Sequence, residues 1–189
     1  MKKPFVSAEQ LAEITKQYPT PFYLYDEKGI RENARQLHQA FQWNQGFKEY
    51  FAVKATPTPA ILEILREEGC GLDCSSLTEL MLADALGFSG EEIMFSANMT
   101  PLEDFLLAYN LGAVINLDDI TDIEYFQHVP SIPKKVCLRY NPGGNFQISN
   151  EIMDTPGEAK YGLTRPQLTK AFKQLLSLGV QEFGLHAFL

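Results

Sequence analysis

Short apolar runs that alternate with amphipathic stretches constrain the fold of this chain more than any other feature. From the second run to the sixth they recur about every 20 to 22 residues, which is the spacing of one parallel strand, one crossover helix and two loops. The pattern therefore predicts a parallel sheet covered by helices. The predicted strands are residues 21–26, 50–55, 71–76, 92–97, 112–118, 134–141 and 182–188.

Capping residues mark the helix boundaries between these runs. Residues 7–18 are predicted as a further helix that Ser7 caps, and Pro101 is expected at the first helical position of another. Three pairs have capping-box spacing, namely Ser76 with Glu79, Thr100 with Glu103, and Thr164 with Gln167. Four glycines fall where helices should end, at Gly69, Gly87, Gly112 and Gly179.

The segment after the second predicted strand favours a barrel over an open nucleotide-binding sheet. An open sheet would show a Gly-rich turn there, whereas residues 56–60 read TPTPA. A complete (β/α)8 barrel needs about 250 residues, so this α/β chain of 189 residues is expected to form a TIM-like barrel that stops before closing. We expect a helical lead-in over residues 1–20 and the partial barrel over 21–189. Segment 142–163 is too long and too rich in Gly, Pro and Asn for a simple connection, and such loops often carry function.

Overall charge and cysteine usage narrow the classes of function. A net charge of −8 would repel nucleic acid, and no basic run is long enough to reverse that field. The three cysteines lack zinc-ligand spacing, so we expect no metal site and reduced thiols in a cytoplasmic protein. No run approaches the roughly 20 apolar residues of a membrane span. The N-terminus has no apolar core of the kind found in a signal peptide.

One lysine lies within an apolar run, in YFAVKAT at residues 50–56. Side chains of a strand alternate between faces, so Phe51 and Val53 are expected to pack on helices while Ala52 and Lys54 face the barrel lumen. The C-terminal ends of barrel strands carry the chemistry. Burial there would lower the pKa of the amine and make it a nucleophile suited to an aldehyde. The alternative is a lysine that extends from the strand end to water.

The order of several motifs resembles that of the fold-type III pyridoxal-phosphate decarboxylases, and most of all the diaminopimelate decarboxylases. The resemblance runs from about residue 20 to the end and rests on TPFYLYDEKGIREN, YFAVKATPTPAIL, GLDCSSLTEL, LRYNPG, KYGL and GLHAF. It implies pyridoxal 5'-phosphate as cofactor and an alanine racemase-like barrel as the N-terminal domain. It also implies a C-terminal β domain that this chain lacks and a homodimer whose subunits share active sites.

Five residues take on roles through this resemblance. Lys54 corresponds to the lysine that forms a Schiff base with the cofactor aldehyde, and Ala52 to a small residue beside the ring. Asp73 corresponds to a carboxylate near the Schiff-base end, and Arg139 to the arginine that completes that polar cluster. His186 corresponds to the imidazole against one face of the pyridine ring. Without the resemblance, Asp73 could simply precede a helix and His186 could be a core histidine.

Two departures from the family pattern bear on contact with the cofactor phosphate and on the identity of the substrate. Residues 187–189 read AFL, where relatives have a Gly-Ser turn near the phosphate, and Thr100 replaces a lysine while Asn98 is retained. The Gly-rich phosphate loop and the acid that pairs with the pyridine nitrogen are expected beyond residue 189. We therefore expect a divergent subgroup, and a fragment that is inactive alone.

The expected activity is the decarboxylation of an amino acid, with meso-diaminopimelate as substrate and lysine as product. An ornithine- or carboxynorspermidine-type decarboxylase is the alternative within enzymes. Alanine racemase fits less well, because its lysine precedes a different run from ATPTPA. A non-catalytic barrel that regulates a partner is the alternative from another class.

Overall fold

The computed structural model describes residues 4–144, 157 and 159–187. Six parallel strands form one sheet in the order β1-β2-β3-β4-β5-β6, so each strand pairs with the next along the chain. The strands are β1 (Tyr50–Ala52), β2 (Gly71–Cys74), β3 (Ile93–Ser96), β4 (Val114–Leu117), β5 (Lys135–Tyr140) and β6 (Glu182–Ala187). This arrangement confirms the parallel α/β fold expected from the spacing of the apolar runs.

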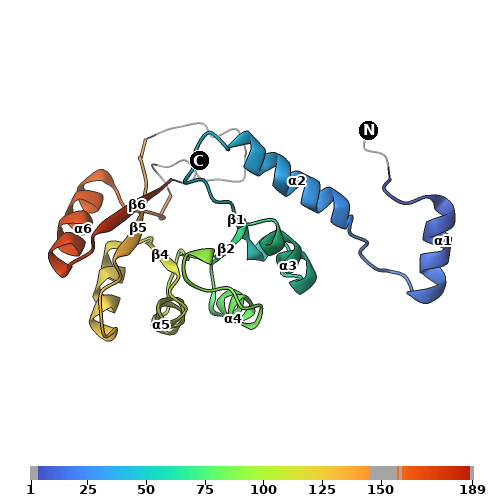
Figure 1. Ribbon diagram of the computed structural model, residues 1–189. Helices are drawn as coiled ribbons and strands as arrows, with labels where there is room; N and C mark the ends of the chain where they lie inside the picture. Colours follow the sequence, from blue (N-terminus) through green and yellow to red (C-terminus); the bar gives the residue numbers. More distant parts are fainter. Residues whose placement is uncertain (1–3, 145–156, 158, 188–189) are drawn as a thin grey trace.

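The helices that come after β1 in the chain lie along one face of the sheet (Figure 1). The α-helices are α1 (Ala8–Gln17), α2 (Glu27–Ala40), α3 (Pro59–Glu67), α4 (Leu77–Ala85), α5 (Leu102–Asn110) and α6 (Arg165–Leu178). Three 3-10 helices complete the set, namely η1 (Val53–Ala55), η2 (Gly90–Glu92) and η3 (Ile120–His128). In Figure 1, α1 extends away from the sheet, and it contains no buried residue.

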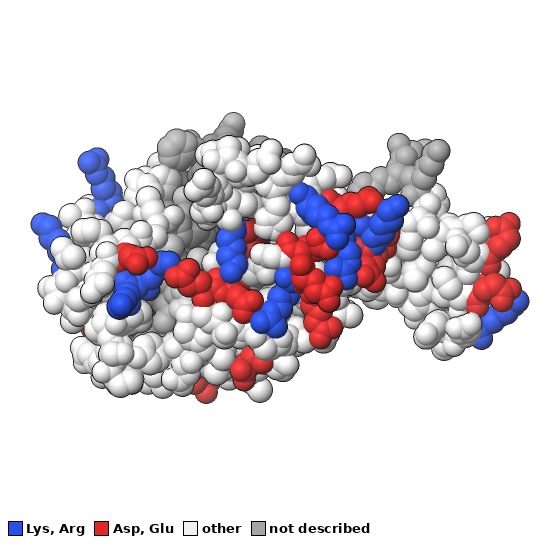
Figure 2. Space-filling view, viewed as in Figure 1, with Lys and Arg blue, Asp and Glu red and all other residues white. Residues whose placement is uncertain are grey.

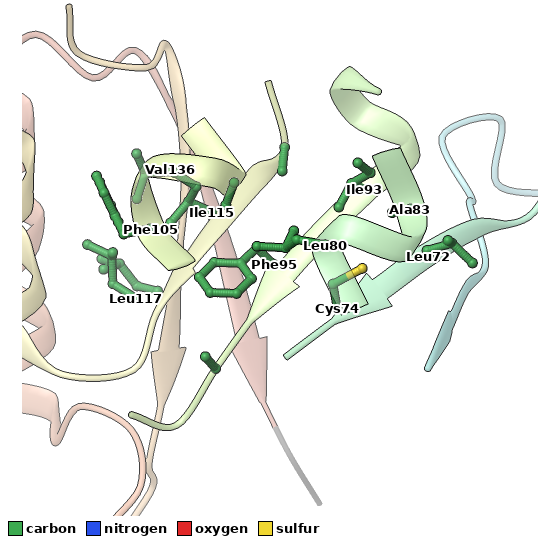
Figure 3. Close-up of a cluster of buried hydrophobic side chains, with 14 of the residues drawn as sticks. Leu72, Cys74, Leu80, Ala83, Ile93, Phe95, Phe105, Ile115, Leu117 and Val136 are labelled. Carbon is green, nitrogen blue, oxygen red and sulfur yellow. The ribbon is translucent and has the colours of Figure 1, made fainter. Parts of the chain in front are cut away.

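The core lies between the sheet and its covering helices. Alternate residues of the strands point to the helices, as Leu72, Ile93, Phe95 and Val136 do, and each is at most 1% exposed (Figure 3). The residues between them, such as Asp73, face the opposite side. The strand period of two therefore separates a dry core from a polar face.

Most predicted helix boundaries are confirmed, because local capping chemistry decides them. The side chains of Ser7 and Thr164 form capping boxes at α1 and α6, and Ser76 caps α4. The four glycines expected to end helices all have positive φ, for example Gly179 at 105°, where other residues would be strained.

Two predictions of secondary structure were wrong. Pro101, not Thr100, is the N-cap of α5, and no side chain caps that helix. Residues 21–26 form no strand, because no strand of the described residues lies beside them to complete a ladder, and Tyr23 is 89% exposed.

Surface charges of both signs are interspersed. Arg31 and Arg35 of α2 pair with Glu67 and Glu68 at the C-terminal end of α3. Figure 2 shows this mixed group without a broad basic surface on the same face. The described helices also include none that is long and apolar enough to cross a membrane.

Candidate active site

A cavity of about 620 Å³ opens at the C-terminal ends of the strands. Its volume lies within the range of small-molecule sites. Its lining residues come from β1–β6 and the turns after them, which is where barrels carry their chemistry. They are Tyr50, Lys54, Asp73, Met94, Ser96, Asn98, Asn116, Asp118, Cys137, Arg139, Ala159, Tyr161, Leu185 and His186.

Lys54 faces the cavity from the 3-10 turn η1, immediately after β1. Its neighbour Val53 is fully buried on the core side, so the chain at this point separates the two side chains as predicted. The expected burial of Lys54 was wrong, however, because the residue is exposed. The strand ends at Ala52, two residues before Lys54, so Lys54 lies in the 3-10 turn and not in the sheet.

Asp73 of β2 is the acidic group near Lys54. Burial raises the pKa of its carboxyl above the usual value, while a hydrogen bond from the Ser96 hydroxyl and the attraction of Lys54 oppose that rise. The carboxyl group lines the cavity, where a cationic or proton-donating group of a ligand could contact it.

Arg139 of β5 is buried in the opposite wall of the cavity. Its Nη1 lies 2.7 Å from Asp118 Oδ1 and 2.6 Å from Asn98 Oδ1. The guanidinium also lies 5.2 Å from the centre of the Tyr161 ring. These contacts compensate the burial of the charge and fix its position.

His186 of β6 is the register neighbour of Arg139. Burial lowers the pKa of its imidazole, and the charge of Arg139 lowers it further, while Asp118 acts in the opposite direction. At neutral pH the ring is therefore mainly uncharged.

The described end of the long 142–163 segment closes this wall. The backbone N–H of Gly162 donates to Asp118 Oδ2 at 3.1 Å, and Tyr161 lines the cavity. Gly162 has a φ of +78°, and a Cβ there would lie 3.2 Å from Arg139 Cγ, so glycine suits this position. Residues 145–156 and 158 lie outside the described residues.

The structure brings together four of the five predicted site residues, namely Lys54, Asp73, Arg139 and His186. The fifth, Ala52, pairs with Asp73 in the sheet but is not among the lining residues of the cavity. A shift from strand to 3-10 turn directly after Ala52 separates its side chain from that of Lys54.

Sequence reasoning missed Asp118 and Asn116. Both lie in the run INLDD, where residues 115 and 117 face the core and residues 116 and 118 therefore face the cavity. A polar residue at every second position of an otherwise apolar strand was the available signal.

The comparisons with known proteins agree with this geometry. The family model described as "Pyridoxal-dependent decarboxylase, pyridoxal binding domain" matches residues 27–188. Protein TabA of Pseudomonas amygdali pv. tabaci is 40% identical, over 95% of this chain and 41% of that protein. Diaminopimelate decarboxylase of Bacillus subtilis is 33% identical, over 97% of this chain and 43% of that protein.

Solved structures show the same fold. The structure of diaminopimelate decarboxylase from M. jannaschii in complex with L-lysine has a TM-score of 0.82 and 25% identity. The match covers 95% of this chain and 44% of that one, so the chain spans less than half the length of these relatives.

The family model covers most of the chain, including every residue that lines the cavity. These residues supply an amine, a carboxylate, a buried guanidinium and an imidazole. The chain therefore belongs to the pyridoxal-dependent decarboxylases, and residues 27–188 are its pyridoxal-binding domain.

Proposed function

We propose that the protein is a pyridoxal-phosphate-dependent amino-acid decarboxylase that converts meso-diaminopimelate to lysine. The observation that carries this proposal is the convergence of Lys54, Asp73, Arg139 and His186 on one cavity in a pyridoxal-binding domain. A non-catalytic barrel that regulated a partner would not need to retain all four of these side chains.

The cavity suits the cofactor in size and in chemistry. It offers an accessible amine for an aldehyde and a buried cation for an oxygen that carries negative charge. The side-chain amide of Asn116 is buried without a hydrogen-bond partner among the described residues, which favours a polar ligand over an apolar one.

Lys54 is the residue we assign to the aldehyde carbon of the cofactor. Lys54 lines the cavity and is exposed, so an incoming amino acid can reach the same carbon. Asp73 places a carboxylate near Lys54 on this side of the cavity. When bound, the cofactor supplies the electron-accepting ring that makes the loss of CO2 feasible.

Arg139 and His186 act from the other wall. Asp118 and Asn98 hold the guanidinium in place before any ligand enters, so binding needs little rearrangement of this side chain. The uncharged imidazole of His186 can lie against an aromatic ring without bringing a second positive charge beside Arg139.

The substrate assignment rests on the relatives. Diaminopimelate decarboxylases from Bacillus subtilis and Methanothermobacter thermautotrophicus are 33% and 29% identical to this chain. The M. jannaschii relative was solved with L-lysine, the product that we propose. Protein TabA, at 40% identity, carries a different name, so an ornithine- or carboxynorspermidine-type substrate remains the alternative.

We further propose a homodimer that completes the active site, as the family resemblance implies, and a cytoplasmic location. The location is supported by three cysteines that are all free and buried. The division into a lead-in over residues 1–20 and a barrel domain over 21–189 belongs to the same proposal.

A decarboxylation assay tests the function. Purified full-length protein with pyridoxal phosphate should release CO2 from meso-diaminopimelate faster than from lysine, ornithine or carboxynorspermidine. Lys54→Ala should abolish this release, whereas Lys173→Ala, at an exposed position of α6, should leave it unchanged. If the protein turned over ornithine alone, the substrate would be reassigned. If it bound the cofactor but turned over no amino acid, the result would support a regulatory role.

A further inference from the structure

Asn116 is a buried polar residue in β4 that the fold itself does not use. The residue is 3% exposed, yet neither its side-chain oxygen nor its side-chain nitrogen has a hydrogen-bond partner in the described part of the chain. Buried amide groups nearly always have such partners. The side chain lines the cavity, so a ligand in the cavity can reach it.

The neighbouring side chains do not offer the missing partners. Asn116 is in register with Ser96 of β3 and Cys137 of β5. The hydroxyl of Ser96 donates to Asp73, and burial raises the pKa of Cys137 to about 11, which keeps its thiol neutral. A neutral thiol is only a weak donor.

The position of Asn116 places its amide deeper in the cavity than the carboxylate of Asp118. Asn116 lies two residues before Asp118 on the same face of the chain, which corresponds to about 6.6 Å further from the C-terminal end of β4. The strand runs between β2, which carries Asp73, and β6, which carries His186. A ligand that extends from Lys54 to Arg139 therefore passes over this amide.

We propose that Asn116 is a further cofactor-binding residue, whose side-chain amide hydrogen-bonds a polar substituent of the pyridoxal ring inside the cavity. The inference rests on the proposed function, because it takes pyridoxal phosphate as the ligand. The physical basis is that a buried amide without hydrogen bonds destabilises the protein when the cavity is empty, and that a hydrogen bond to the ligand removes this destabilisation.

The test is a pair of measurements on full-length Asn116→Leu, which has nearly the shape of the native side chain but no polar atoms. Urea unfolding without cofactor reports stability, and titration with pyridoxal phosphate reports the dissociation constant. We expect the free protein to be at least as stable as the native one, because an unpaired amide has been removed. We expect cofactor affinity to fall roughly three- to tenfold, the range for one lost neutral hydrogen bond.

Two further variants control the experiment. Ile115→Val, on the core face of the same strand, should lower stability without changing the affinity, which separates a disturbed β4 from a lost ligand contact. Asn116→Ser removes the amide with a smaller side chain, so the affinity can still be measured if leucine does not fit. Borohydride trapping of the cofactor on Lys54 at saturation should stay intact in every variant.

The outcomes are distinct. Loss of affinity in both Asn116 variants, with normal affinity in Ile115→Val, supports the inference. Native affinity in both Asn116 variants overturns it and leaves the proposed function intact. Failure of the native protein to bind pyridoxal phosphate overturns the inference and the proposed function together.

Discussion

Arg139 carries a buried charge, and the carboxylate of Asp118 lies beside it. The two side chains are 10% and 5% exposed, and their closest atoms are 2.7 Å apart. The attraction compensates the loss of hydration, and the same pair shapes the wall of the cavity.

Replacement of Asp118 by Asn should therefore destabilise the protein. The change keeps the shape of the side chain but removes the carboxylate that lies 2.7 Å from the guanidinium. Loss of one partner of a buried ion pair costs about 3 kcal/mol. Urea unfolding measures the loss. Glu13→Gln, which removes an exposed pair with Lys16, is the control and should leave the midpoint nearly unchanged. Equal effects of the two changes would mean that burial of the Arg139 pair is unimportant.

His186 should make stability depend on pH. The folded state lowers the pKa of its imidazole below the usual 6.5, so the unfolded chain takes up the proton first. Stability from this group is present above pH 6.5 and is lost as the pH falls through the lower pKa of the folded state. His186→Gln should flatten this part of the profile when the free energy of unfolding is measured against pH. A native profile in the variant would assign the dependence to other groups.

Contacts between helices decide how the elements are positioned. Asp104 of α5 is 6% exposed, and its Oδ2 accepts a hydrogen bond from the Leu77 N–H at the start of α4, at 2.9 Å. This N–H has no partner within α4, because the first turn of any helix leaves its N–H groups free. The later helix α5 thus caps the preceding helix α4, and this contact joins the two helices.

Asp104→Ala should lower the free energy of unfolding by about 2 kcal/mol, the range for a hydrogen bond to a charged group. Glu103→Ala is a matched control, because Glu103 lies next to it in the first turn of α5 but is exposed. Chemical denaturation compares the two. If both variants lost the same stability, the effect would come from charge near the N-terminus of α5 and not from the cap.

Local chemistry explains why most elements could be predicted from the sequence and others could not. Capping by Thr164 and termination at Gly179 depend on residues within a few positions of each other. The strand predicted at residues 21–26 is absent, because a strand needs a neighbouring strand to pair with, and the local sequence does not show whether one is present. In the site, the alternation of residues predicted which way Lys54 faces, whereas its exposure depends on the turn that follows β1.

The three cysteine thiols are buried in the folded chain. Cys70 and Cys74 lie in the hydrophobic core, and Cys137 lines the cavity. Cys70, Cys74 and Cys137 are at most 6% exposed. Burial raises the pKa of Cys74 to about 12 and that of Cys137 to about 11, so few thiolates form near neutral pH.

A thiol-specific disulfide reagent should therefore react with none of the cysteines in the native protein and with all three after unfolding in urea. The number of thiols is read from the absorbance of the released reagent. Fast reaction of a cysteine in the native protein, located by mass spectrometry, would show that this part of the core is open in solution.

The central assignment concerns Lys54, and one measurement tests it most directly. Full-length protein is incubated with pyridoxal phosphate, reduced with borohydride and mapped by mass spectrometry, with Lys173→Ala and Lys54→Ala treated in parallel. We expect a phosphopyridoxyl adduct on Lys54 in the native protein and in Lys173→Ala, and no adduct at that position in Lys54→Ala. An unmodified Lys54, with the adduct absent or on another lysine, would contradict the assignment.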